Sequence, residues 1–487
     1  MGYINIKPII MKATILFSLC SSLLFFSCVS ETRELDAGSP EIAEGAQTDP
    51  GSTITFLSDS LIKFSSGLDN PYFVINEDEK TGYLYAEVKA GHYEPVGAER
   101  TPLNIALVID RSGSMAGEKV HYVKEAAKFV IDNLDSKDHM SIVIYDDDVD
   151  VLFASAMIEN KSQLKSLVDE IFDRGSTNLS GGMLEGYEQV KSSFNDEFVN
   201  RVLLLSDGLA NAGITEVDKL EEICRKKNRE KGISISTFGV GADYNEDLML
   251  GLAEHGSGNY YFIETPDQIP NIFKRELDGL LSVVAQNMKM TITLPSGVQV
   301  SKVFGYKYEQ KGKELIVHFR DVFSEDVKSV LVKFKMEEDV SSTLSFTTKI
   351  QWDDVLGDLE RKTLTRMEIV EAVSDTSIYA QAFNTTVMQQ VTVFEANYAL
   401  QMAMQKIDEG YYQEARDIVR ANSVYLEDQF KYIPKNSEMH VQDSLNTDYN
   451  EKIEDAENMG SYEKSVLQKG SKSFNYEIKT KRTEKKK

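Results

Sequence analysis

The sequence predicts an α/β domain with a doubly wound, mostly parallel sheet, inserted in a β-sandwich and followed by a short helical segment. Residues 103–109 and 201–205 are nearly continuous apolar runs, as expected of strands buried on both faces. Helix-type patterns separate these runs, which is typical of a parallel sheet. Outside this region, residues 82–90 and the segments after residue 288 alternate apolar and polar side chains, which indicates antiparallel sandwich strands.

Length and composition limit the class of protein. With 487 residues the chain is long enough for two or more domains. Its formal charge of −25 argues against nucleic acid as a partner, because phosphate backbones attract Lys and Arg. Most acidic side chains are solvated surface, although Asp and Glu also supply the oxygen ligands that divalent cations prefer. Cys224 is the one cysteine after residue 28, so the mature chain is predicted to have no internal disulfide.

The amino terminus is predicted to be a targeting segment. Residues 15–26 form an apolar run that is too short to span a bilayer and that ends at Ser27-Cys28. We therefore interpret residues 1–28 as a signal peptide with a lipobox-like end, in which Cys28 becomes lipidated and anchors the protein in a bacterial cell envelope. An ordinary secretory signal is the alternative, because Phe25 and Phe26 stand where Leu and a small residue are more usual.

The segments around the α/β region predict an insertion. Residues 29–53 have the composition of a flexible tether. Strand-like patterns in residues 54–100 have no sheet of their own, and we expect them to pair with the alternating strands of residues 286–372. Residues 101–285 would then be a domain inserted in the sandwich, since the termini of a compact domain often lie close together.

Oxygen-bearing side chains follow the first buried strand. The run 103–109 is followed by Asp110-x-Ser112-x-Ser114, and a helix pattern begins after this turn. In α/β sheets such a turn lies at the carboxyl ends of the strands, where ligands bind. Hydroxyl and carboxylate oxygens suit a small divalent cation such as Mg²⁺ or Mn²⁺. The same residue types are also common in turns and helix caps, so this segment alone leaves both interpretations open.

Two later segments carry further oxygens to the expected edge of the sheet. Thr177 stands in the loop Gly-Ser-Thr-Asn-Leu at residues 175–179, and Asp207 ends the second buried strand. In a doubly wound sheet both residues lie on the same edge as Asp110.

This three-part pattern resembles the von Willebrand factor A domain and its metal-ion-dependent adhesion site, over about residues 101–280. The resemblance implies that the hydroxyls bind the cation, that the carboxylates bind it directly or through water, and that an acidic residue of a partner protein completes the coordination. The implied ligands are Asp110, Ser112, Ser114, Thr177 and Asp207. Arg111 and the segment 207–211 resemble the bacterial and inter-α-trypsin-inhibitor-type branches rather than integrins.

The other elements of the inserted domain alternate along the chain. The helices are expected at residues 120–134, 161–172, 179–194, 219–231, 246–255 and 267–285. The strands are expected at residues 140–145, 149–153, 233–241 and 258–263, with 149–153 as an antiparallel edge strand. The acidic turn 146–148 either lies near the metal-site edge, as the resemblance implies, or is a solvated hairpin turn, which the frequency of Asp in turns favours.

The carboxyl-terminal part is predicted to be helical and then disordered. Helix patterns at residues 377–408 and 412–421 define a helical segment over 373–430. Residues 431–487 are polar and are predicted to be disordered, ending in a basic run. This run either contacts anionic lipid or acidic partners, or is a solvated terminus.

The chain lacks the sequence patterns of common enzymes. The serine of Gly113-Ser114-Met115-Ala116-Gly117 stands one position early for a nucleophile elbow. No paired histidine spacing for zinc and no nucleotide-binding glycine loop is present. We therefore predict a non-enzymatic protein with no evident small-molecule substrate. The remaining alternatives are a cation-dependent protein-binding site, a scaffolding lipoprotein whose cation only ties loops together and, as a less favoured third, a metal-dependent hydrolase.

Overall fold

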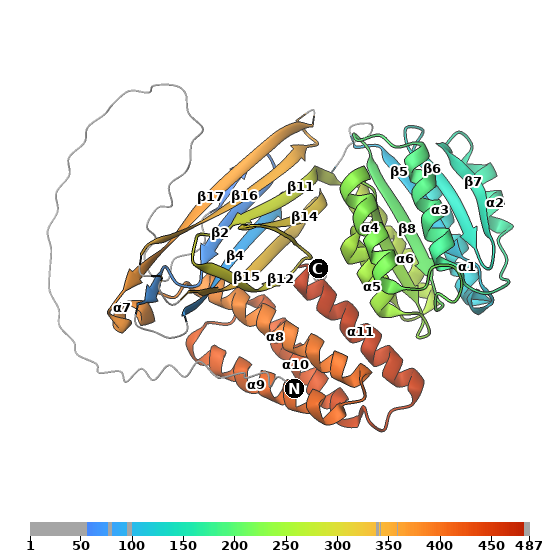
Figure 1. Ribbon diagram of the computed structural model, residues 1–487. Coiled ribbons are helices and arrows are strands. Elements are labelled where there is room, and N and C mark those ends of the chain that lie inside the picture. The colour runs from blue at the N-terminus through green and yellow to red at the C-terminus, as the bar shows by residue number, and fades with distance from the viewer. Residues whose placement is uncertain are drawn as a thin grey trace. The chain divides into compact units, whose positions relative to one another are not determined.

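The computed structural model describes residues 56–75, 80–94, 100–337, 340, 342–357 and 359–481 (Figure 1). The predicted signal peptide at residues 1–28, with Cys28, and the predicted tether at residues 29–53 lie outside these ranges. No helix in the described part of the chain has the length and apolar character needed to cross a bilayer.

The inserted domain is built on a six-stranded sheet in the order β10-β9-β8-β5-β6-β7. Its strands are β5 (Leu103–Asp110), β6 (His139–Tyr145), β7 (Val149–Met157), β8 (Val199–Ser206), β9 (Ser234–Val240) and β10 (Ser257–Ile263). Its helices are α1 (Glu118–Asn133), α2 (Lys161–Asp169), α3 (Leu179–Ser192), α4 (Val217–Lys231), α5 (Glu246–His255) and α6 (Ile269–Leu281). All neighbouring strands pair in parallel except β6 and β7. The predicted doubly wound fold, with an antiparallel edge strand, is confirmed.

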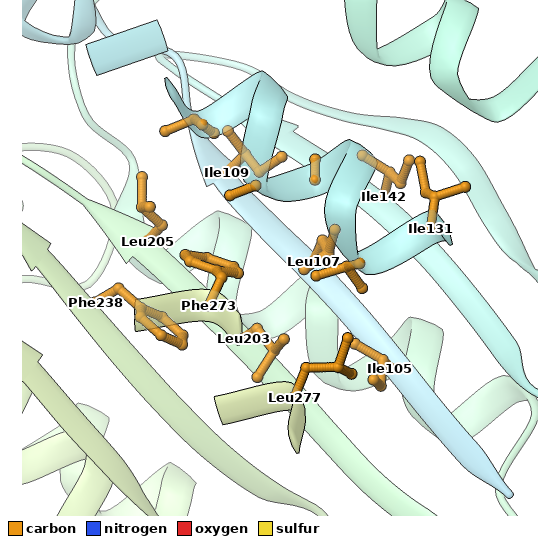
Figure 2. Close-up of a cluster of buried hydrophobic side chains, with 14 of the residues drawn as sticks. Ile105, Leu107, Ile109, Ile131, Ile142, Leu203, Leu205, Phe238, Phe273 and Leu277 are labelled. Carbon is orange, nitrogen blue, oxygen red and sulfur yellow. The ribbon is translucent and has the colours of Figure 1, made fainter. Parts of the chain in front are cut away.

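The surroundings of strand β5 explain why its sequence is continuously apolar. Ile105 and Leu107 point into a core formed with α1, α2 and α6, and Figure 2 shows them near Phe273 and Leu277 of α6. Val108 belongs to the opposite core, which is formed with α3, α4 and α5. Because helices cover both faces, successive residues of the strand are all buried, each fully buried Leu or Ile contributing about 1.5–3 kcal/mol.

The sandwich consists of a five-stranded sheet, β1-β2-β4-β15-β12, and a six-stranded sheet, β13-β14-β11-β16-β17-β3. The strands before the inserted domain are β1 (Leu57–Asp59), β2 (Ile62–Leu68), β3 (Tyr72–Val74) and β4 (Lys80–Ala90). The strands after it are β11 (Val283–Thr293), β12 (Val298–Phe304), β13 (Glu309–Lys311), β14 (Glu314–Phe323), β15 (Val327–Met336), β16 (Leu344–Asp354) and β17 (Glu360–Val373).

The pairing of β4 shows that the α/β domain is inserted in the sandwich. β4 pairs antiparallel with β15 over ten positions, from Lys80↔Met336 to Lys89↔Val327. A strand that precedes the inserted domain and a strand that follows it therefore share one sheet, as expected for residues 82–90. The helix expected at 267–285 is shorter, because α6 ends at Leu281 and Val283 already begins β11.

The carboxyl-terminal part is more ordered than the sequence predicts. Its helices are α7 (Thr376–Gln381), α8 (Thr385–Asp408), α9 (Tyr412–Tyr432), α10 (Ser437–Asp455) and α11 (Ser461–Lys479). The expected helix at 377–408 is interrupted before Asn384, whose side chain accepts a hydrogen bond from the Val387 N–H and caps α8.

The prediction of a disordered tail at residues 431–487 is wrong as far as residue 481. Tyr449 and Ile453 of α10 pack into a core with α8 and α9, and Tyr476 of α11 is buried against the inserted domain. The apolar stripe of these helices is narrow because they also bury amides such as Asn446, which accepts a hydrogen bond from Asn422 at 2.8 Å. For this reason the polar sequence pattern of α10 and α11 does not indicate that the two helices are packed.

Candidate metal centre

The predicted ligands lie on three loops at the carboxyl edge of the sheet. Asp110 is the last residue of β5, and Asp207 directly follows β8, which pairs with β5 in parallel. Ser114 lies in the short 3₁₀ helix Gly113–Met115, and Thr177 lies in the loop before α3. Since parallel neighbours end at the same edge, the two carboxylates meet there.

Hydrogen bonds and close contacts join these side chains. The Ser112 and Ser114 Oγ atoms are 3.1 Å apart, and Ser114 Oγ donates to Asp207 Oδ1 at 2.7 Å. The Ser112 N–H donates to Asp110 Oδ1 at 2.8 Å. A Cβ added to Gly208 would lie 3.0 Å from Thr177 Oγ1 and 3.7 Å from Ser114 Oγ, so Thr177 borders the same space. The structure thus brings all the predicted ligands together.

The site is buried except on one side. Asp110 and Asp207 are 0 % exposed and Thr177 is 3 % exposed, whereas Ser114 is exposed to solvent. Burial raises the pKa of Asp110 to about 6, against the lowering effect of hydrogen bonds from Ser112 and Ser206. The neighbouring Asp207 carboxylate adds to the rise, which is the expected effect of two like charges held close together.

Backbone groups fasten the loops to one another. The Gly113 N–H donates to the Gly175 carbonyl at 3.0 Å. The Thr177 N–H donates to Asn211 Oδ1 at 3.0 Å, and the Asn211 N–H donates to the Thr177 carbonyl at 3.2 Å. These bonds hold the loop positions independently of the ligand side chains.

The acidic turn at residues 146–148 contacts the loops of the site. The favoured interpretation as a solvated turn is wrong for its first residue, Asp146. Asp146 is 1 % exposed and accepts hydrogen bonds from Arg111 Nε at 2.6 Å and Arg174 Nε at 2.7 Å. Its carbonyl accepts from the Asn178 N–H at 2.8 Å. Burial acts to raise the pKa of Asp146, but the two arginines hold it below its ordinary value. Asp148 remains exposed.

Two further residues at the site carry no signal in the sequence pattern. Ser206 Oγ donates to Asp110 Oδ2 at 2.6 Å and so orients that carboxylate. Lys119 Nζ donates to the Ser114 carbonyl at 3.2 Å and forms an ion pair with Asp207 Oδ2. Neither residue belongs to the three-part motif, and the carboxylates that they contact are 88 positions away for Lys119 and 96 positions away for Ser206.

The donor set fits a hard divalent cation. It consists of neutral hydroxyls and carboxylates, without nitrogen or sulfur, which is the chemistry that Mg²⁺ and Mn²⁺ select. An acidic cluster of Glu246, Asp247 and Asp408 elsewhere in the described chain is different, although its oxygens lie within 4.8 Å of one another. Lys472 Nζ contacts all three carboxylates, at 3.1, 2.9 and 2.6 Å, and Lys469 also pairs with Glu246, so two ammonium groups already occupy the cluster.

The fold and the loops define a class, namely α/β domains that present hydroxyl and carboxylate oxygens at the carboxyl edge of a parallel sheet. Residues 104–275 match the family described as von Willebrand factor type A domain. The chain therefore carries a von Willebrand factor type A domain. Domains of this family commonly mediate protein–protein interaction.

Known proteins of this family share part of the chain. The uncharacterised protein YfbK of Escherichia coli is 33% identical over 210 residues, which are 42% of this chain and 36% of that protein. The inter-alpha-trypsin inhibitor heavy chain H3 of Rattus norvegicus is 27% identical over 255 residues, covering 48% and 28% respectively. This chain thus spans about a third of the length of these relatives.

A solved structure extends the likeness of the fold beyond the inserted domain. The von Willebrand factor type A protein from Catenulispora acidiphila superimposes with a TM-score of 0.60 at 13% identity. The superposition covers 76% of this chain and 91% of the Catenulispora protein. Proteins of this family such as the inter-alpha-trypsin inhibitor heavy chains are typically non-enzymatic.

Proposed function

We propose that this protein binds a partner protein through a Mg²⁺ or Mn²⁺ ion held at the carboxyl edge of its inserted domain. The observation that carries the proposal is the meeting of oxygen side chains from three loops on one partly exposed edge. The residues that would hold the cation are Asp110, Ser112, Ser114, Thr177 and Asp207.

The partner would present an Asp or Glu carboxylate. A divalent cation bound here would supply positive charge to an anionic ligand. Ser114 marks the side open to solvent, while Asp110 and Asp207 are buried behind it. A carboxylate approaching from the open side would enter a partly dry site, in which charge-assisted contacts are strong.

The alternative is a cation that only ties the loops together. The backbone hydrogen bonds between Gly113 and Gly175, and between Thr177 and Asn211, already perform that task. We therefore favour the binding function, in which the cation acts on a partner. A hydrolase remains the third candidate, and no contact at the site favours it.

Titration of Mg²⁺ and Mn²⁺ into the wild-type chain by calorimetry is the direct test. Asp110→Ala should abolish binding, because it removes one of two ligand charges. Thr177→Ala should weaken it by roughly tenfold or less, since water replaces a neutral hydroxyl readily around Mg²⁺. Both variants should fold, because the buried runs of β5 and β8 are unchanged.

Asp148→Ala is the matched control, because it removes an exposed carboxylate from the neighbouring turn. It should leave the affinity unchanged. Equal affinities in the wild type, Asp110→Ala and Thr177→Ala would mean that these are only turn residues, and the proposal would lose its site. As a separate experiment, a pull-down of the mature chain with and without EDTA would test whether partner binding depends on the cation.

We also propose that Cys28 carries a lipid that anchors the protein in a bacterial cell envelope. The apolar run at 15–26 that ends in Ser27-Cys28 supports this. Cys28→Ala should move the protein from the membrane fraction to the soluble fraction in the native host. Wild-type protein that is wholly soluble and cleaved at another bond would contradict the lipoprotein interpretation.

A further inference from the structure

We infer that Lys119 is a specificity-determining residue of the metal centre, which weakens binding of the cation alone and makes tight binding depend on an incoming carboxylate. The inference rests on the proposed function. Lys119 is the second residue of α1, and its ammonium forms an ion pair with the Asp207 carboxylate. Any cation held by Asp207 would share that carboxylate with this ammonium.

Both carboxylate oxygens of Asp207 already accept hydrogen bonds from side chains of the site. Asp207 is 0 % exposed, its Oδ1 accepts from Ser114 Oγ at 2.7 Å, and its Oδ2 accepts from Lys119 Nζ. The same ammonium donates to the Ser114 carbonyl at 3.2 Å. Lys119 thus contacts two of the predicted ligand residues at once.

Lys119 also lies near the backbone that follows β9. Gly241, which has a φ of +76°, directly follows β9, and a Cβ added there would lie 3.7 Å from Lys119 Nζ and 3.8 Å from its Cε. The side chain is 23 % exposed. A lysine in the first turn of a helix is unfavourable with respect to the helix dipole, so its place here indicates compensation by Asp207.

The charges explain the expected effect. Asp110 and Asp207 contribute two negative charges, and Lys119 contributes one positive charge, so the three groups sum to −1. A divalent cation therefore leaves a net charge of +1 at the site, which a partner carboxylate neutralises. Without Lys119 the cation and the two carboxylates would already balance, and the demand for a further anion would fall.

Lys119→Met removes the charge and keeps most of the side-chain volume. Calorimetric titration of Mn²⁺ alone should give a dissociation constant lower by roughly five- to tenfold than in the wild type, because one like charge is removed from a partly solvated site. N-acetylaspartate amide at fixed concentration should strengthen Mn²⁺ binding in the wild type more than in Lys119→Met. Lys124→Met is the matched control on the same helix, since Lys124 Nζ donates to the Asp169 carbonyl at 2.9 Å.

The outcomes separate the two proposals. If the wild type binds Mn²⁺ and Lys119→Met binds it equally well or more weakly, the role of Lys119 is overturned. The metal centre itself would then still stand. Failure of both proteins to bind Mn²⁺ overturns the proposed function and this inference with it. Should Lys119→Met fail to fold by circular dichroism, Lys119→Gln, which keeps a donor for the Ser114 carbonyl, is measured against the same expectations.

Discussion

Buried carboxylates in this protein behave according to their immediate partners. Asp146 lies between Arg111 and Arg174, and these cations hold its pKa below the ordinary value although burial opposes them. Asp69 is also buried, and it accepts the Tyr83 N–H at 2.8 Å. Burial raises the pKa of Asp69 to about 7, against smaller lowering effects of backbone hydrogen bonds.

The raised pKa of Asp69 predicts a pH dependence of stability. Its folded pKa of about 7 lies above the ordinary value of 3.8, so the fold disfavours ionisation. The contribution of the protonated carboxyl to stability is complete below pH 3.8 and is lost as pH rises through 7. Asp69→Asn keeps an oxygen that accepts the Tyr83 N–H and does not ionise. It should raise the free energy of unfolding at pH 8 by up to about 4 kcal/mol relative to wild type.

Urea denaturation between pH 4.5 and 8 measures this effect as the difference between variant and wild type. Taking the difference cancels other titrating groups if they are distant from Asp69. Asp148→Asn, at an exposed turn position, is the control and should give a difference that is flat with pH. Parallel curves for wild type and Asp69→Asn would show that Asp69 ionises normally in the folded protein.

Among the elements, α11 depends most clearly on contacts outside itself. Lys469 Nζ donates to the Tyr244 carbonyl at 2.7 Å, and Tyr476 Oη donates to the Gly258 carbonyl at 3.2 Å. Lys472 is 13 % exposed and lies among three carboxylates of α5 and α8. The helix is thus fastened to the inserted domain and to α8 by its polar side.

Lys472→Met should loosen α11. The variant leaves the carboxylates of Glu246, Asp247 and Asp408 close together without their shared ammonium, and like charges at such distances repel. The free energy of unfolding should fall by about 2–3 kcal/mol, since a partly buried ion pair loses one member. Amide hydrogen exchange should accelerate over residues 461–479.

Lys452→Met is the control for this prediction, because Lys452 forms an exposed pair with Asp448 at 2.8 Å within α10. Its effect should stay within about 0.5 kcal/mol. If both variants unfold at the same urea concentration and exchange alike, the ion pairs of Lys472 do not hold α11 in place.

At the scale of the whole molecule, the candidate metal centre lies away from the connections to the sandwich. The chain enters the inserted domain before Leu103, at the amino end of β5, and leaves it after α6, which ends at Leu281. Asp110 lies at the other end of β5, about 25 Å away at the usual rise per residue of a strand. The ligand-bearing edge is therefore opposite to the edge that carries both connections.

Contacts between the inserted domain and the sandwich lie on the side of these connections. Arg201 of β8 forms an ion pair with Asp321 of β14 at 3.0 Å, and Arg320 Nε donates to Asn228 Oδ1 of α4 at 3.1 Å. Arg201 is 1 % exposed, so this pair is part of the folded core. The contacts join the two parts without involving the predicted ligands.

The sequence by itself determined the parts that follow from local periodicity. The apolar runs of β5 and β8 are continuous because helices cover both faces of the sheet, and this pattern predicts parallel strands. The carboxyl ends of parallel neighbours meet, so Asp110 and Asp207 were predictable as neighbours although 97 positions separate them. That β4 would pair with a strand after the inserted domain followed from strands that had no other sheet to join, while β15 as its partner is a finding of the structure.

Only the tertiary structure decided the features that depend on partners from distant segments. The order of α10 and α11 comes from a few buried apolar side chains together with buried amides and ion pairs to other elements, which a polar sequence pattern does not reveal. The burial of Asp146 depends on Arg111 and Arg174, and the contact of Lys119 with Asp207 depends on α1 and β8 meeting at one edge. Local sequence encodes which face of an element is buried. Which charges meet there is set by the packing of elements against one another.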